Sequence, residues 1–126
     1  MHSQFLLCGG PRIATAAAEA ALIGEAGNIP KPKFGPDVMF AIACVIRQRG
    51  SLQGIYGANN PVVKHVSAKL RARAAHAWLA SSFCLHPSAI TRGCAYFGCP
   101  TDARYFRHIL QFKPVFATGT ITFYKP

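Results

Sequence analysis

The pattern of apolar and polar positions along the chain predicts four helices. In residues 61–83, apolar side chains recur at spacings of three and four residues and form one helix face. The members of that face are Val63, Val66, Leu70, Ala74 and Ala77. Residues 11–26 are rich in alanine, which has the highest helix propensity, and residues 101–112 combine a capping threonine with an apolar face. The fourth helix is expected at 36–49.

The predicted helix at 36–49 differs from the others because its middle, Val38 to Ile46, is apolar on all sides. A helix without a polar face must be covered on every side. Asp37 near its start and Gly50 after its end are favourable at helix termini, and they favour a helix over a buried strand. We therefore expect a fully covered helix here.

Loops rich in proline and glycine join the predicted helices. Residues 28–36 contain prolines that force extended geometry, and they are predicted to be a linker. The expected fold class is therefore mainly α, with an extended or β segment at 113–126. Residues 1–126 should form either a single small domain or an extended subunit, since domains commonly have about 100–200 residues.

The C-terminal residues 115–124 alternate in the manner of a β-strand. No second run of that quality exists in the sequence, and a lone strand is not stable in water. We expect the segment to add to the sheet edge of a neighbouring chain, or to lie as a strap in a partner's groove. The predicted apolar interface residues are Phe40, Phe116, Ile121, Phe123 and Tyr124.

The composition combines high hydrophobicity with an excess of positive charge. Hydrophobic residues make up 51% of the chain and charged residues only 14%, and the formal net charge is +10. Whole-chain disorder is excluded, because disordered chains combine low hydrophobicity with high charge. So few charged residues would leave apolar patches on an independent surface, which indicates a protein that is buried in something larger.

The positive charges are concentrated in a stretch without acids. From Val38 to Thr101 the chain has no Asp or Glu, so its cations are expected to find counter-charges outside the chain. A solvated basic surface is the competing interpretation. The residues predicted to contact a partner or phosphates are Arg47, Arg49, Lys64, Lys69, Arg71, Arg73 and Arg92.

The cysteine and histidine residues suggest a zinc site or a disulfide, but their spacing supports each of these only weakly. Cys84, His86, Cys94, Cys99 and His108 could supply zinc ligands, but the spacings do not form a tight pair of ligand knuckles. The spacing of Cys84 and Cys94 resembles one half of the twin Cys-x9-Cys pattern of mitochondrial intermembrane-space proteins, whose second half is missing. A disulfide between them is one hypothesis, and buried free thiols are the preferred one. No catalytic motif is present, so we predict no enzyme and no cofactor.

These observations together predict a non-catalytic accessory subunit of a large assembly. We expect the host to be a membrane complex of mitochondrial energy metabolism, at the inner membrane or its surface. The expected partners are other protein subunits, together with anionic lipid head groups. One alternative is an organellar ribosomal protein whose basic stretch binds rRNA phosphates. A second alternative is a small metal-binding or redox protein.

Overall fold

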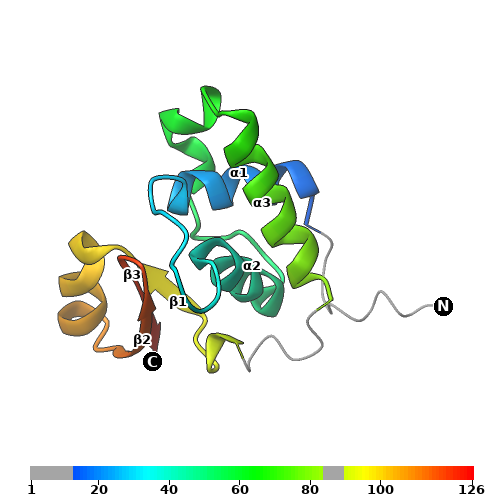
Figure 1. Ribbon diagram of the computed structural model, residues 1–126. Helices are drawn as coiled ribbons and strands as arrows, with labels where there is room; N and C mark the ends of the chain where they lie inside the picture. Colours follow the sequence, from blue (N-terminus) through cyan, green and yellow to red (C-terminus); the bar gives the residue numbers. More distant parts are fainter. Residues whose placement is uncertain (1–12, 84–89) are drawn as a thin grey trace.

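The computed structural model describes residues 13–83 and 90–126 of the chain. It is mainly α with a β C-terminal part, as the sequence predicts. The α-helices pack together, and a small sheet lies to one side of them (Figure 1). The helices are α1 (Thr15–Ala26), α2 (Val38–Arg49) and α3 (Ala68–Ser81).

Helix α2 forms the centre of the core. Every residue from Val38 to Ile46 is buried except Phe40, which is half-buried and packs against the same core. At its start, Asp37 accepts a hydrogen bond from the Met39 backbone N–H at 3.0 Å. At its end, Gly50 adopts a left-handed conformation with φ 72°. Helices α1 and α3 pack against α2, so the cover that its sequence requires comes from its own chain.

Two glycines let the loop after α2 approach α1 closely. A side chain at Gly24 would place its Cβ far inside van der Waals contact of the Gly57 carbonyl oxygen. A Cβ at Gly57 would in turn lie 2.6 Å from the Ala21 carbonyl oxygen. Gly57 begins the 3-10 helix η2 (Gly57–Asn59), which packs against α1. The absence of side chains at both positions therefore permits the close approach of this loop to the helix.

The single helix predicted at 61–83 is divided in the structure. A 3-10 helix, η3 (Pro61–Lys64), comes first, and α3 begins only at Ala68. Asn60 accepts a hydrogen bond from the Val62 N–H at 3.0 Å and caps η3, while Ser67 accepts one from the Leu70 N–H at 3.1 Å and caps α3. Two N-caps seven residues apart define two helix starts, which periodicity alone does not reveal.

The C-terminal part forms an antiparallel sheet within the chain, which corrects the prediction of one strand without an internal partner. Its strands are β1 (Tyr96–Gly98), β2 (Lys113–Thr118) and β3 (Ile121–Lys125), in the order β1-β3-β2. The run expected to be one strand turns at Gly119, whose φ of 60° suits a residue without a side chain. Strand β1, which has only three residues, pairs with the other edge of β3.

The helix predicted at 101–112 is present as an irregular helical stretch over residues 100–109, with two distinct helical elements. They are the 3-10 helix η4 (Pro100–Asp102) and the π-helix η5 (Tyr105–Ile109). Phe106 of η5 stacks on Tyr124 of β3 with ring centroids 4.5 Å apart, so η5 is anchored on the sheet. Within the described part of the chain, no helix has both the length and the apolar character needed to cross a membrane.

Candidate functional site

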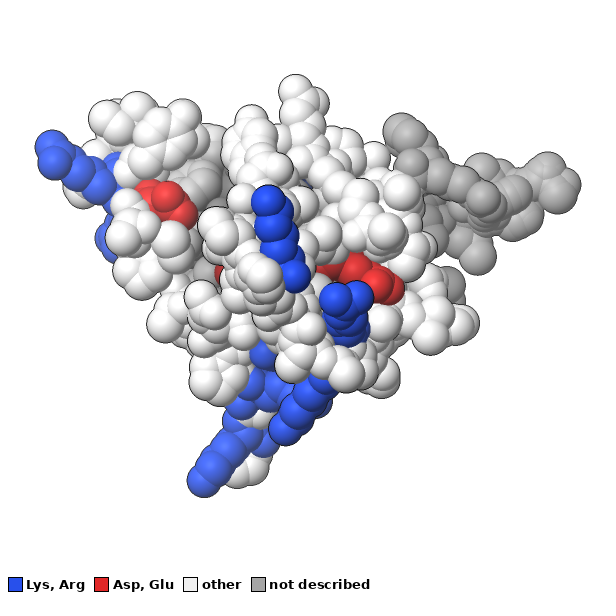
Figure 2. Space-filling model, turned by 90° about the horizontal axis from the view of Figure 1, so that it is seen from above, with Lys and Arg blue, Asp and Glu red and all other residues white. Residues whose placement is uncertain are grey.

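Basic side chains outnumber acidic ones on the surface of the described residues, and few of them are neutralised internally. Figure 2 shows Lys and Arg side chains projecting from several separate places on one face, whereas Asp and Glu appear only as small patches. The described part of the chain contains one ion pair, between Arg73 and Asp37. The exposed cations are Lys31, Lys33, Lys64, Lys69, Arg71, Arg92, Arg104, Arg107, Lys113 and Lys125.

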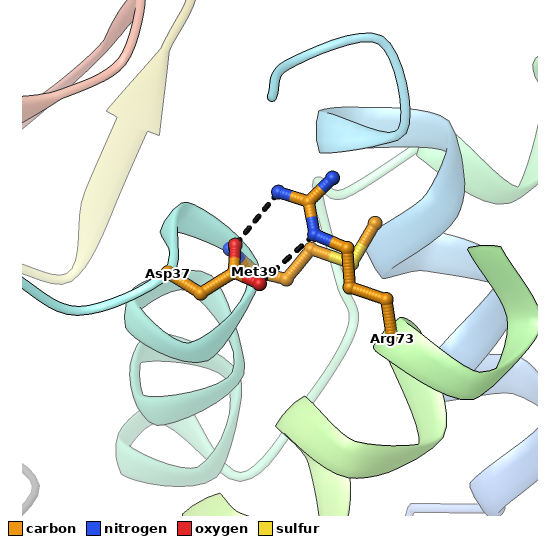
Figure 3. A network of polar contacts seen from close by, with 3 residues as sticks. All are labelled: Asp37, Met39 and Arg73. Atoms are coloured by element: carbon orange, nitrogen blue, oxygen red, sulfur yellow. Dashed lines mark hydrogen bonds and ion pairs between the residues drawn. The ribbon is translucent and has the colours of Figure 1, made fainter. Parts of the chain in front are cut away.

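Arg73 is the first predicted contact residue that has a partner in its own chain. Its Nε donates to Asp37 Oδ2 at 2.9 Å, and its Nη2 donates to Asp37 Oδ1 at 2.7 Å (Figure 3). Asp37 lies one residue before the acid-free stretch and starts α2, while Arg73 faces it from α3. Arg73 was predicted to take its counter-charge from another molecule, but Asp37 of the same chain supplies that charge.

The pKa of Asp37 reflects this pairing. Burial would raise the pKa, but the hydrogen bonds from Arg73 and from the Met39 backbone, with the charges of Arg73 and Lys31, lower it below its ordinary value. The carboxylate is thus held in its charged form at the junction of α2 and α3.

Arg47 is the second predicted contact residue with partners in its own chain. Its Nε donates to Ser81 Oγ at 2.6 Å, and its Nη2 donates to the Trp78 carbonyl oxygen at 2.8 Å. Its guanidinium carbon also lies 3.7 Å from the centre of the Trp78 ring, within cation–π range. Arg47 therefore joins the C-terminal turns of α2 and α3.

The other predicted contact residues differ in their exposure and in their contacts within the chain. Lys64, Lys69 and Arg71 are exposed, and their side chains form no hydrogen bond or ion pair within the described residues. Arg49 is half-buried and donates to the Gln53 carbonyl oxygen. Arg92 is exposed, and its guanidinium carbon lies 5.0 Å from the centre of the Phe116 ring. The first three are the strongest candidates for contact with a partner.

A basic groove of about 700 Å³ brings one of these residues together with other cations. It lies between the proline-rich linker and the N-terminal half of α3. Lys31, Lys69 and His76 line it beside the Arg73–Asp37 pair, whose charges cancel. The net charge of the groove wall is therefore positive, which suits a carboxylate or phosphate.

Three of the predicted apolar interface residues are not available to a partner. Ile121, Phe123 and Tyr124 are buried in the core of their own chain, because β3 is the central strand of the sheet. Phe116 is half-buried and stacks on Phe123 with ring centroids 4.5 Å apart. The segment from 113 to 126 is thus part of the fold rather than a free strap.

Of the cysteines that the structure describes, Cys44 and Cys94 are buried and Cys99 is half-buried. Burial raises the pKa of Cys94, although the positive charges of Lys125 and Arg92 lower it in part. Cys84 and His86 lie outside the described residues, so the predicted disulfide partner and one proposed zinc ligand are not placed. Among the described residues no three His, Cys, Asp or Glu side chains gather as metal ligands would.

Sequence reasoning missed a second cavity, of about 380 Å³, beside the sheet. Glu25 from the end of α1 and Asp102 of η4 line it, although they lie far apart in the sequence. Aromatic rings form most of the remaining wall: Tyr56, Tyr96, Phe97, Tyr105 and Phe106. No spacing signal connects these residues, since only the fold brings α1 and β1 to the same place.

No protein-family model matches the chain, and neither a curated protein nor a solved structure is significantly similar to it. Its function is therefore inferred from its own residues and their arrangement.

Proposed function

We propose that the chain is a non-catalytic accessory subunit that docks through its basic surface onto an acidic partner surface of a larger assembly. One observation carries this proposal: exposed Lys and Arg side chains are numerous, and the described residues contain a single ion pair. Uncompensated surface charge of one sign attracts the opposite sign and speeds encounter with it. The groove containing Lys31, Lys69 and His76 supplies a concave place for such a contact.

RNA is a second candidate partner, and exposed aromatic rings favour it. Phe34 is 88% exposed and follows Lys33 directly, and Phe83 is 75% exposed. Single-stranded nucleic acids are bound by basic side chains on phosphates together with aromatic rings on which bases stack. In that case the chain would belong to an organellar ribosome.

The double substitution Lys69→Gln with Arg71→Gln is expected to weaken binding to either partner. Glutamine keeps a helix propensity similar to that of Lys and Arg, so α3 should remain folded. For single-stranded RNA, each lost phosphate contact should reduce the slope of log affinity against log salt by about 0.7. Fluorescence anisotropy with labelled polyglutamate and labelled oligouridylate, over a salt series, measures both the affinity and the slope.

The matched control is Ala68→Gln with Ala75→Gln, which places two glutamines at exposed positions of the same helix without removing charge. We expect it to leave the affinity and the slope unchanged. Binding to polyglutamate alone supports an acidic protein partner, whereas binding to oligouridylate alone supports RNA. If neither polymer binds at low salt, the docking proposal is wrong.

The host assembly is a separate part of the proposal. We propose a mitochondrial membrane complex of energy metabolism, because the chain combines a high apolar content with few charges. Native gel electrophoresis of a mitochondrial extract should place the tagged chain in a band far above the mass of a free chain. Migration as a free chain, or recovery with ribosomal particles, would count against that host.

A further inference from the structure

The cavity beside the sheet has an unusual wall for so basic a protein. The chain has four acidic residues, and two of them, Glu25 and Asp102, line this one cavity. Neither carboxylate forms an ion pair within the described part of the chain. The wall also contains Arg49, so its formal charge is −1 in a protein whose formal net charge is +10.

Both carboxylates are held in place by hydrogen bonds that leave oxygen lone pairs unused. Asp102 Oδ2 accepts from the Cys99 backbone N–H at 3.1 Å and from the Cys99 thiol at 3.2 Å. Glu25 accepts from the backbone of Gly57, which the close approach of α1 and η2 places beside it. A carboxylate offers about four acceptor positions, so each can accept further donors.

The charges of the two carboxylates act on each other. Burial raises the pKa of Glu25, the hydrogen bond from the Gly57 backbone lowers it, and the negative charge of Asp102 raises it again. The net shift of the Glu25 pKa is upward, so the ionised form is less stable here than it would be in water. A positive charge placed between the two carboxylates would offset the free-energy cost of burying Glu25 and the repulsion between the two carboxylates.

Aromatic rings supply the rest of the binding surface. Tyr56 and Tyr105 are more than half exposed beside the cavity, and Tyr96 contributes a third phenol ring from β1. The faces of aromatic rings attract cations, and cages of such rings recognise quaternary ammonium groups. Arg49 already uses this property, because its guanidinium carbon lies 5.9 Å from the centre of the Tyr96 ring.

We propose that this cavity binds an organic cation of the alkylammonium class between Glu25, Asp102 and the tyrosine rings. Phosphates and other anions are disfavoured, because the two carboxylates repel them. A bare metal ion is also disfavoured, since hard cations require six or more oxygen ligands and the wall is mainly aromatic. The cation can belong to a free choline-like molecule or to a methylated lysine side chain of a protein.

Titration of the full chain with choline and with its neutral isostere, 3,3-dimethylbutan-1-ol, tests the charge requirement directly. The two molecules share shape and hydroxyl group, so a difference in affinity reports the positive charge. We expect choline to bind about tenfold more tightly than the isostere. A peptide carrying trimethyl-lysine, compared with its unmodified form and with choline, distinguishes a protein ligand from a free one.

Glu25→Gln should remove part of this roughly tenfold preference for choline over the isostere, whereas Glu19→Gln should leave the preference unchanged. Both glutamates are on α1, but Glu19 does not line the cavity. Asp102→Asn keeps acceptors for the Cys99 hydrogen bonds and provides a second test if Glu25→Gln fails to fold. Equal affinity for choline and its isostere, an equal loss in Glu19→Gln, or no binding of either cationic probe at millimolar concentration would each overturn the proposal.

Discussion

Replacing Gly24 by alanine is expected to lower the free energy of unfolding by about 3 kcal/mol. At an ordinary position inside a helix, the same change stabilises a protein by roughly 1 kcal/mol. The sign is reversed here because the new Cβ collides with the backbone carbonyl of Gly57, which has no flexible end that can move aside. Urea denaturation of the full chain, followed by circular dichroism, measures the difference.

The matched control is Ala17→Gly, an exposed position on the same helix. It removes helix propensity alone and should lower the free energy of unfolding by about 1 kcal/mol. Since the Gly24–Gly57 contact also places Tyr56 beside Glu25, Gly24→Ala should weaken choline binding as well. A Gly24→Ala variant that is more stable than the parent protein would show that α1 and η2 do not approach as closely as described.

Local signals in the sequence predicted the centre of the fold. Helix α2 follows from its apolar run together with Asp37 and Gly50, because a cap and a left-handed glycine act within one turn of the helix they delimit. The division between η3 and α3 was missed, although Ser67 is a good N-cap. The apolar spacing continues through residues 61–83, and periodicity does not show which of two capping residues starts a new helix.

The sheet shows where alternation misleads. A hairpin with a two-residue turn inverts the alternation of faces. Phe116 of β2 therefore lies beside Phe123 of β3, whereas one continuous strand would place them on opposite faces. Gly119 was the available signal for the turn. Strand β1 has only three residues and gains its stability from pairing with β3, which no local pattern reveals.

The candidate sites show the same limit. Lys69 and Arg71 are exposed and form no ion pair within the described residues, and their contact with a partner stays a prediction. Arg73 was also included, because the acid-free stretch was counted along the chain and Asp37 stands one residue outside it. The cavity with Glu25 and Asp102 depends on contacts between distant segments, which the fold alone creates.

The pair formed by Asp37 and Arg73 is expected to make stability depend on pH in the acid range. The folded pKa of Asp37 is lowered below its ordinary value near 3.8, so the folded protein favours the carboxylate more strongly than the unfolded chain does. This contribution is fully present above the ordinary pKa and is lost as pH falls through the lowered folded pKa.

Two substitutions at this position separate the two roles of the carboxylate. Asp37→Asn keeps a good N-cap for α2 and loses the ion pair, whereas Asp37→Ala loses both. Because the side chains of Arg73 and Asp37 are 13% and 14% exposed, water screens the pair in part, and we expect Asp37→Asn to cost about 1 kcal/mol at pH 7. Asp37→Ala should cost about 1 kcal/mol more, through the lost hydrogen bond to the Met39 N–H.

Urea denaturation of the parent protein and both variants, repeated from neutral pH into the acid range, measures these free-energy differences. The difference in the free energy of unfolding between the parent protein and Asp37→Asn should shrink as the pH falls. Protonated Asp37 no longer carries the charge that pairs with Arg73. The difference between Asp37→Asn and Asp37→Ala should stay nearly constant, since neither side chain titrates. If the free energies of unfolding of the parent protein and Asp37→Asn differ by the same amount at every pH, the ion pair contributes nothing to stability.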